Sequence, residues 1–239
     1  MIYQFKINDL EIEVDYPQED IEEVYLPLLE KLTNLQKAKN RRLIVFLAAP
    51  PGCGKTTLSY FLQYLSNERK EITPIQALGI DGFQYTQNYL NNTMINGKFL
   101  AKYKGSPETF DVDSLIEKIQ KLLNENISWP LYSRKLHDPI YDAIKVEKDI
   151  ILIEGNYLLL NQGKWAELKS YCDYSIFLKN DYDLLEKRLV ERKVMGGSSL
   201  KEATEHYQVS DSKNVLTVLN NSLPADLVIE LNDNKVKRD

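Results

Sequence analysis

Residues 49–57 of this 239-residue chain have the types and spacing of a loop that binds phosphate groups. They match the pattern G-x-x-x-x-G-K-[ST] at every fixed position but the first, where Ala49 replaces glycine. In such a loop, backbone N–H groups surround a β-phosphate, the lysine reaches the β- and γ-phosphates, and the hydroxyl binds Mg²⁺. The predicted nucleotide-binding residues are Pro51, Gly52, Cys53, Gly54, Lys55, Thr56 and Thr57. For Cys53, a small space-filling role is favoured over a redox role.

Two acidic residues follow apolar runs that are typical of buried strands. Asp81 ends the run Ile75–Ile80, and Glu154 ends the run Ile150–Ile153. A carboxylate at the carboxyl edge of a strand beside the loop can accept the proton of an attacking hydroxyl, and the second acid suits Mg²⁺ or its waters. The alternatives are that Asp81-Gly82 is only a turn and that Glu154 is an ordinary strand end.

Basic residues gather on a helical pattern over about 181–195, just before the flexible stretch 196–199; they are Lys187, Arg188, Arg192 and Lys193. A second helical pattern covers about 199–221. Because Glu186, Glu191 and Glu202 lie nearby, a solvated, salt-bridged helix face is the alternative to a phosphate-binding role.

The elements that must position these residues can be read from the apolar spacing. Five short apolar runs alternate with amphipathic helical segments, which predicts a parallel sheet covered on both faces. The runs are Leu43–Ala49, Ile75–Ile80, Ile150–Ile153, Tyr174–Leu178 and Leu227–Leu231. Before them, alternation over Ile2–Tyr16 around Asn8-Asp9 predicts a β-hairpin, and spacing of three and four over Gln18–Gln36 predicts a helix.

In order and spacing, the motifs resemble those of the phosphoribulokinase/uridine kinase family of P-loop kinases, over about residues 41–231. They are the loop, Asp81-Gly82-Phe83, KGSPETFD at 104–111, Pro130-Leu131-Tyr132, His137-Asp138-Pro139 and Ile153-Glu154-Gly155-Asn156-Tyr157. The likeness is strongest to a bacterial branch of nucleoside- or sugar-kinase-like proteins, with bacterial P-loop pantothenate kinases as near relatives.

The resemblance implies a P-loop kinase-type three-layer α/β sandwich with a mainly five-stranded parallel sheet and a helical lid at about 181–212. It implies ATP- and Mg²⁺-dependent transfer of the γ-phosphate to a hydroxyl of a nucleoside or sugar. The implied catalytic residues are Asp81 as base, with Lys55, Arg188 and Arg192, and the implied metal ligands are Thr56 and Glu154. The expected acceptor-binding residues are Asp81, Phe83, Tyr85, Lys104, Tyr132, Arg134 and His137.

Departures from the family's patterns bear on the acceptor. Uridine-phosphorylating members carry P-x-Y-D followed by H-x-R, but here Ser133 replaces the Asp and Pro139 the Arg. Tyr132-Ser133 is nearer the pantothenate kinase pattern, although Arg134 replaces its histidine. Pantothenate kinase-like activity and a non-catalytic nucleotide-binding regulatory role are therefore alternatives, and His137 has the alternative of a capping or core role.

Composition excludes several classes of protein. The net charge is −5, and residues 1–40 account for it with nine acidic and four basic side chains. The lack of a basic stripe argues against a nucleic-acid partner. Two cysteines give no disulfide framework, and the longest apolar run falls far short of the roughly 18 residues of a membrane span. We expect a cytoplasmic kinase domain at 41–239 with an acidic appendage at 1–40 that covers a sheet edge or contacts a second subunit in a homodimer.

Overall fold

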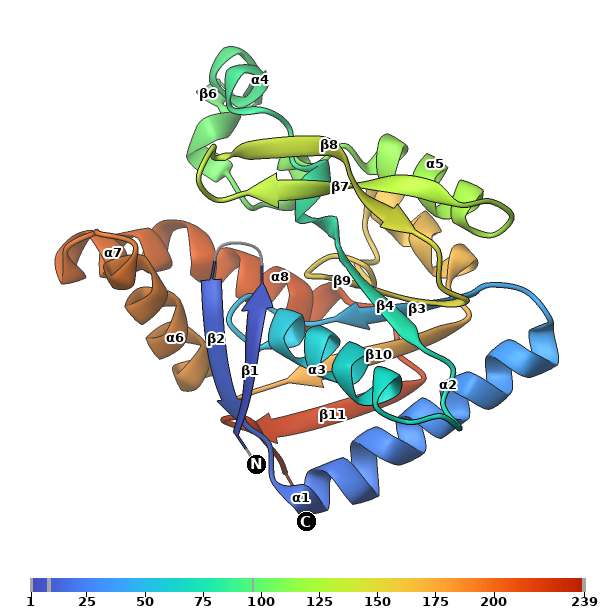
Figure 1. The fold of residues 1–239 in the computed structure, drawn as a ribbon. Helices are drawn as coiled ribbons and strands as arrows, with labels where there is room; N and C mark the ends of the chain where they lie inside the picture. Colours follow the sequence, from blue (N-terminus) through green and yellow to red (C-terminus); the bar gives the residue numbers. More distant parts are fainter. Residues whose placement is uncertain (1, 8–9, 96, 238–239) are drawn as a thin grey trace.

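The computed structural model describes residues 2–7, 10–95 and 97–237. At its centre is a six-stranded sheet with the order β12-β11-β10-β3-β9-β4. Figure 1 labels the five strands from β11 to β4. All neighbouring strands are parallel except β12, which runs antiparallel to β11. This confirms the predicted parallel sheet and adds one short antiparallel edge. The bounds are β3 Leu43–Ala48, β4 Ile75–Gly79, β9 Ile150–Gly155, β10 Tyr174–Lys179, β11 Leu227–Asn232 and β12 Lys235–Val236.

Strand β3 shows why the molecule has three layers. Leu43, Val45 and Leu47 belong to one buried cluster, with apolar residues of α2 (Leu26–Lys39) and α3 (Lys55–Asn67). The alternate residues of the strand belong to a second cluster on the opposite face, with α5 (Val112–Leu122) and the 3₁₀ segment η5 (Gly163–Tyr171). A strand that is buried on both faces must be apolar at every position, which is why this run lacks polar alternation.

The segment before β3 packs on the helix that follows the phosphate loop. Strands β1 (Ile2–Ile7) and β2 (Leu10–Asp15) pair as the predicted hairpin requires, and among the described strands they pair only with each other. The predicted turn, Asn8-Asp9, lies outside the described residues. Helix α1 (Gln18–Asp20), a π turn η1 (Ile21–Tyr25) and α2 follow without a break, so the helix predicted for 18–36 is confirmed and reaches Lys39. The hairpin lies against α3, where Tyr3 packs edge-on against Phe61.

Residues 80–149 are inserted between β4 and β9 and lie above the sheet in Figure 1. They begin with a 3₁₀ turn, η2 (Ile80–Phe83), which lies close to the long hairpin that ends the insertion. A Cβ on Gly82 would lie 2.5 Å from the backbone of Pro130, so only glycine allows this close approach. The other elements are α4 Gln87–Asn92, β5 Met94–Ile95, β6 Lys98–Phe99, η3 Leu100–Tyr103, η4 Pro107–Thr109, β7 Ile127–Ser133 and β8 Asp138–Val146.

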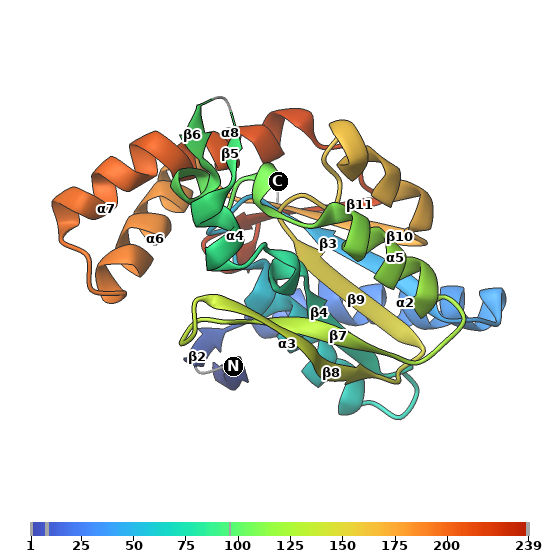
Figure 2. The same cartoon turned by 90° about the horizontal axis from the view of Figure 1, so that it is seen from above.

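The two helical patterns predicted near the C-terminus form the arm of helices at one end of the sheet (Figure 2). Its elements are α6 (Tyr182–Met195), α7 (Leu200–His206), the π turn η6 (Tyr207–Asp211) and α8 (Ser212–Asn221). Ser199 and Glu202 form a capping box that restarts the helix after Gly197. Within the described ranges, no helix combines the length and the apolar character needed to cross a membrane.

Asp173 joins the start of β3 to the start of β10 and to the end of α2. Its carboxylate accepts two hydrogen bonds of 2.8 Å from Arg41 and one of 2.9 Å from the Ile44 N–H, and Lys39 Nζ lies 2.9 Å away. Burial alone would raise the pKa of Asp173, but these hydrogen bonds outweigh burial and hold the pKa below its ordinary value.

We expect Asp173→Asn to lower the free energy of unfolding by about 2 kcal/mol at neutral pH, measured by urea denaturation. A lowered folded-state pKa stabilises the fold above the unfolded pKa of about 4, and this stabilisation is lost as the pH falls through the folded pKa. The difference between wild type and variant should therefore shrink on acidification. Asp149→Asn, at an exposed carboxylate just before β9, is the control. A difference that does not depend on pH would contradict the ionic explanation.

Candidate active site

The phosphate loop connects β3 to α3 beneath helix α6. Gly52 and Gly54 have φ values of 81° and 90°, in the region that favours glycine. A Cβ on Gly52 would lie 3.1 Å from Leu189 Cγ and 3.3 Å from the Leu185 carbonyl oxygen. The first hydrogen bond at the start of α3 runs from the Leu58 N–H to the Gly54 carbonyl at 3.0 Å, so the N–H groups before Leu58 lie at the helix N-terminus, which favours anions.

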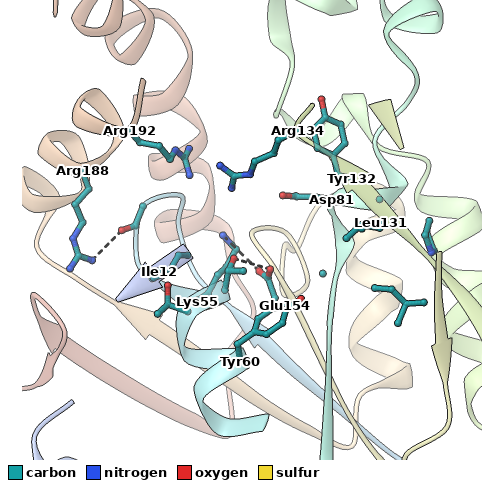
Figure 3. Close-up of a pocket in the computed structure, with 18 of the residues that line it drawn as sticks. Ile12, Lys55, Tyr60, Asp81, Leu131, Tyr132, Arg134, Glu154, Arg188 and Arg192 are labelled. Carbon is teal, nitrogen blue, oxygen red and sulfur yellow. Dashed lines mark hydrogen bonds and ion pairs between the residues drawn. The ribbon is translucent and has the colours of Figure 1, made fainter. Parts of the chain in front are cut away.

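This loop opens into a hollow of about 350 Å³ between α3, α6 and the η2–β7 region (Figure 3), which we call the main cavity because the phosphate loop lines it. Five of the predicted nucleotide-binding residues line it: Gly52, Gly54, Lys55, Thr56 and Thr57. Pro51 and Cys53 are buried and do not line it. Burial raises the pKa of the Cys53 thiol to about 12, so the thiol stays protonated at neutral pH, as expected for a space-filling side chain.

Glu154, at the end of β9, contacts both functional side chains of the loop. Its Oε1 accepts a 2.9 Å hydrogen bond from the Thr56 hydroxyl, and its Oε2 lies 4.0 Å from Lys55 Nζ. Burial raises the pKa of Glu154, and the charge of Asp81 adds to the rise, while Lys55 and Thr56 oppose it. A cation at this position would therefore favour the ionised carboxylate.

The oxygens of Thr56 and Glu154 fit Mg²⁺, which prefers hard oxygen ligands. Within the described ranges, no cluster of three or more His, Cys, Asp or Glu side chains could hold a metal ion. This sparse ligand set is compatible with Mg²⁺, because the ion commonly takes one or two carboxylates and completes its coordination with water and substrate phosphates.

Asp81, Tyr132 and Arg134 line the side of the main cavity formed by η2 and β7. Figure 3 shows Asp81 and Tyr132 close together on this side, with Lys55 between them and helix α6. Asp81 is held in place by η2, because Gly82 packs directly on the β7 backbone. The geometry thus puts an exposed carboxylate where a second substrate could approach the phosphate loop.

The two arginines of α6 have different surroundings. Arg188 donates to the Gly52 carbonyl oxygen at 3.3 Å and to Asn234 Oδ1 at 2.9 Å, and it pairs with Asp233. Arg192 points toward Arg134 across the main cavity (Figure 3), and in the described part of the chain neither of these two forms an ion pair. Partial burial and the charge of Arg134 lower the pKa of Arg192. Two facing guanidinium groups favour an anion between them.

Four of the residues expected to bind the acceptor lie outside the main cavity. Phe83 is buried against Trp129 with ring centroids 4.8 Å apart, and Tyr85 stacks on Tyr89 at 4.3 Å. Lys104 donates to Gln87 at 2.8 Å and to the His137 carbonyl at 3.1 Å, and its ammonium lies 5.3 Å from the centre of the Tyr132 ring. His137 is exposed, with a φ of 56°.

The main cavity also contains residues that the motifs did not indicate, among them Ile12, Tyr60 and Asn234. Tyr60 was detectable, because it follows Thr56 by four residues on α3 and shares its face. Ile12 and Asn234 were not detectable, because each comes from a segment that reaches the cavity only in the folded chain.

Comparison with known proteins finds a matching family and similar sequences. The sequence model of the phosphoribulokinase/uridine kinase family matches residues 44–236. The uncharacterized protein YggC of Escherichia coli K12 is 41% identical over 98% of this chain and 97% of its own length. A putative uridine kinase, C227.14 of Schizosaccharomyces pombe, is 29% identical over 92% of this chain and 94% of its own length.

A solved structure is similar to this chain in fold as well as in sequence. The putative fructose transport system kinase from Silicibacter sp. TM1040 superimposes with a TM-score of 0.74 at 31% identity, covering 84% of this chain and 98% of that one. A family match across most of the chain, a similar solved structure and a phosphate loop at the expected turn lead to one conclusion. The chain belongs to the phosphoribulokinase/uridine kinase family and is a P-loop kinase by fold.

Proposed function

We propose that this protein transfers the γ-phosphate of ATP, with Mg²⁺, to a hydroxyl group of a small molecule, a sugar or a nucleoside. The observation that carries the proposal is the placement of Asp81 across the main cavity from Lys55, with Arg134 and Arg192 facing each other beside it. The named relatives support the substrate classes, because one is a putative uridine kinase and one a putative fructose transport system kinase.

Each group in the cavity would have a distinct part in the transfer. The acceptor hydroxyl gives its proton to Asp81 as its oxygen bonds to the γ-phosphorus, and the bond from that phosphorus to the bridging oxygen breaks to release ADP. Lys55 and the loop N–H groups hold the β- and γ-phosphates. Thr56 and Glu154 would hold Mg²⁺, which neutralises charge on the phosphates when bound.

Arg192 is the arginine of α6 that suits the transferring phosphoryl group. Arg188 is already paired with Asp233 and tied to the loop, whereas Arg192 points into open cavity space toward Arg134. A cation that is unpaired before substrate binds can stabilise the charge that develops on the equatorial oxygens at the transition state.

The acceptor end combines an aromatic ring with apolar neighbours. Tyr132 lines this end of the cavity together with Leu131, Pro130 and Ile144. Such a surface suits the face of a sugar or nucleoside ring, while Asp81 and Arg134 provide polar partners for its hydroxyls.

An ADP-release screen of nucleosides, sugars and pantothenate should find one class with kcat/KM at least 100-fold above the others. ATP binding without transfer to any acceptor would favour a nucleotide-binding regulatory role.

Asp81→Asn should lower kcat by a factor of about 10² to 10⁴, because the amide cannot accept the proton, and should leave the Kd for ATP unchanged. The measurement is steady-state turnover on the best acceptor together with calorimetric ATP binding. Asp142→Asn is the matched control, because Asp142 is an exposed carboxylate of the same insertion outside the main cavity. An Asp81→Asn enzyme with wild-type kcat would rule out general base catalysis by this residue.

Arg192→Met should lower kcat by about 10³, with less than a threefold change in the Kd for ATP, because the contact is made mainly at the transition state. Lys187→Met on the same helix, at an exposed position outside the main cavity, should leave both quantities near wild type. If Arg192→Met instead weakened ATP binding and left kcat intact, the assignment of Arg192 to the transferring group would be wrong.

A further inference from the structure

Ile12 of the N-terminal hairpin lines the main cavity, although the family match begins only at residue 44. Figure 3 shows Ile12 on the side of Lys55 away from Asp81 and Tyr132. Asn234, from the turn between β11 and β12, also lines the cavity and is held there by Arg188, which lies on that same side. Beyond the phosphate loop, the cavity is therefore lined by one segment near the N-terminus, the hairpin, and by one near the C-terminus, the β11–β12 turn.

We propose that the N-terminal hairpin forms one wall of the donor-nucleotide site, and that Ile12 packs against the nucleoside part of the bound nucleotide. The identification of the donor as a nucleoside triphosphate rests on the proposed function. The direction follows from the geometry of the transfer, since the attacking and leaving oxygens lie roughly in line across the γ-phosphorus. With the acceptor hydroxyl at Asp81 and the phosphates at Lys55, the rest of the nucleotide must extend away from Asp81, which is toward Ile12.

The chemistry of the wall fits a nucleoside better than a phosphate. Ile12 is half-buried, while its neighbours Glu11 and Glu13 are exposed, because successive strand residues point to opposite faces. The apolar side chain thus faces the cavity and the carboxylates face away from it, so they do not repel the phosphates. An apolar side chain adds nothing to phosphate binding, whereas ligand sites typically hold ring systems between apolar surfaces.

The hairpin packs against α3, the helix that follows the phosphate loop. The Tyr16 ring stacks on Phe61 of α3 with centroids 4.1 Å apart, and Tyr3 packs edge-on against the same ring at 4.8 Å. Farther along, the Asp20 carboxylate accepts a 2.9 Å hydrogen bond from the Val236 N–H, which ties the segment to β12. These contacts hold the hairpin against the helix that follows the phosphate loop, as a binding wall requires.

The test compares ligands with and without the nucleoside. Ile12→Ala should weaken ATP binding about tenfold, because part of the apolar contact is lost, and should leave the binding of inorganic tripolyphosphate unchanged. Calorimetry without acceptor measures both affinities. Ile12→Val, which keeps most of the contact, should stay within about twofold of wild type. Ile2→Ala is the matched control, since Ile2 lies on the same hairpin and is 67% exposed.

If Ile12→Ala weakened the binding of ATP and of tripolyphosphate equally, Ile12 would have a purely structural role in the loop and the proposal would be overturned. Unchanged ATP binding by Ile12→Ala would also overturn it. Wild-type protein that binds ATP no more tightly than tripolyphosphate would also overturn it. Photolabelling of wild-type protein with 8-azido-ATP gives an independent readout that needs no variant to fold. Label on the peptide that contains Ile12 supports the proposal, and label only elsewhere overturns it. These binding and labelling experiments contain no acceptor, so their results do not depend on phosphate transfer. If the protein transferred phosphate to no acceptor, the proposed kinase activity would fail, but the test of Ile12 would still be valid.

Discussion

Strand β9 is hydrogen-bonded to β3 on one side and to β4 on the other, and its register decides where the charges of the site lie. Glu154 pairs with Leu47 near the end of β3 and with Gly79 at the end of β4. A Cβ on Gly79 would lie 3.2 Å from Glu154 Oε1, so a larger residue would crowd the carboxylate. The register thus brings one buried acid beside the phosphate loop, where Thr56 donates to it and Lys55 approaches it.

The electrostatics of the cavity differ from those of the chain as a whole. The net charge is −5, yet the cavity gathers Lys55, Arg134, Arg188 and Arg192 against Asp81 and Glu154. The excess acid of the N-terminal hairpin points away from this space, with Glu11 and Glu13 exposed on its outer face. Local arrangement, and not total charge, therefore determines the affinity of the site for anions, because solvent screens distant charges more strongly than close ones.

Much of the fold and part of the site could be predicted from the sequence. The five parallel strands, the hairpin and the two C-terminal helical patterns follow from apolar spacing, which is local. The phosphate loop is equally local, since its glycines and Lys55 act within a few residues of one another. The residues that bind the acceptor were harder to predict from the sequence. Tyr132 and Arg134 line the cavity, but His137, only three residues beyond Arg134, lies outside it, because the turn after β7 directs it to solvent.

The N-terminal segment shows most clearly what only the tertiary structure could decide. Its spacing determined a hairpin and a helix, and its composition located the acidity, but neither predicted that the hairpin packs on α3 and reaches the cavity. The folded chain places Tyr3 and Tyr16 on Phe61, adds Leu29 and Leu32 to the core that contains β3, and brings Ile12 to the cavity. The division of the chain at residue 40 stays a prediction. Periodicity records which residues are buried, whereas the partner of each face depends on contacts between residues far apart in the chain, and those contacts exist only once the chain has folded.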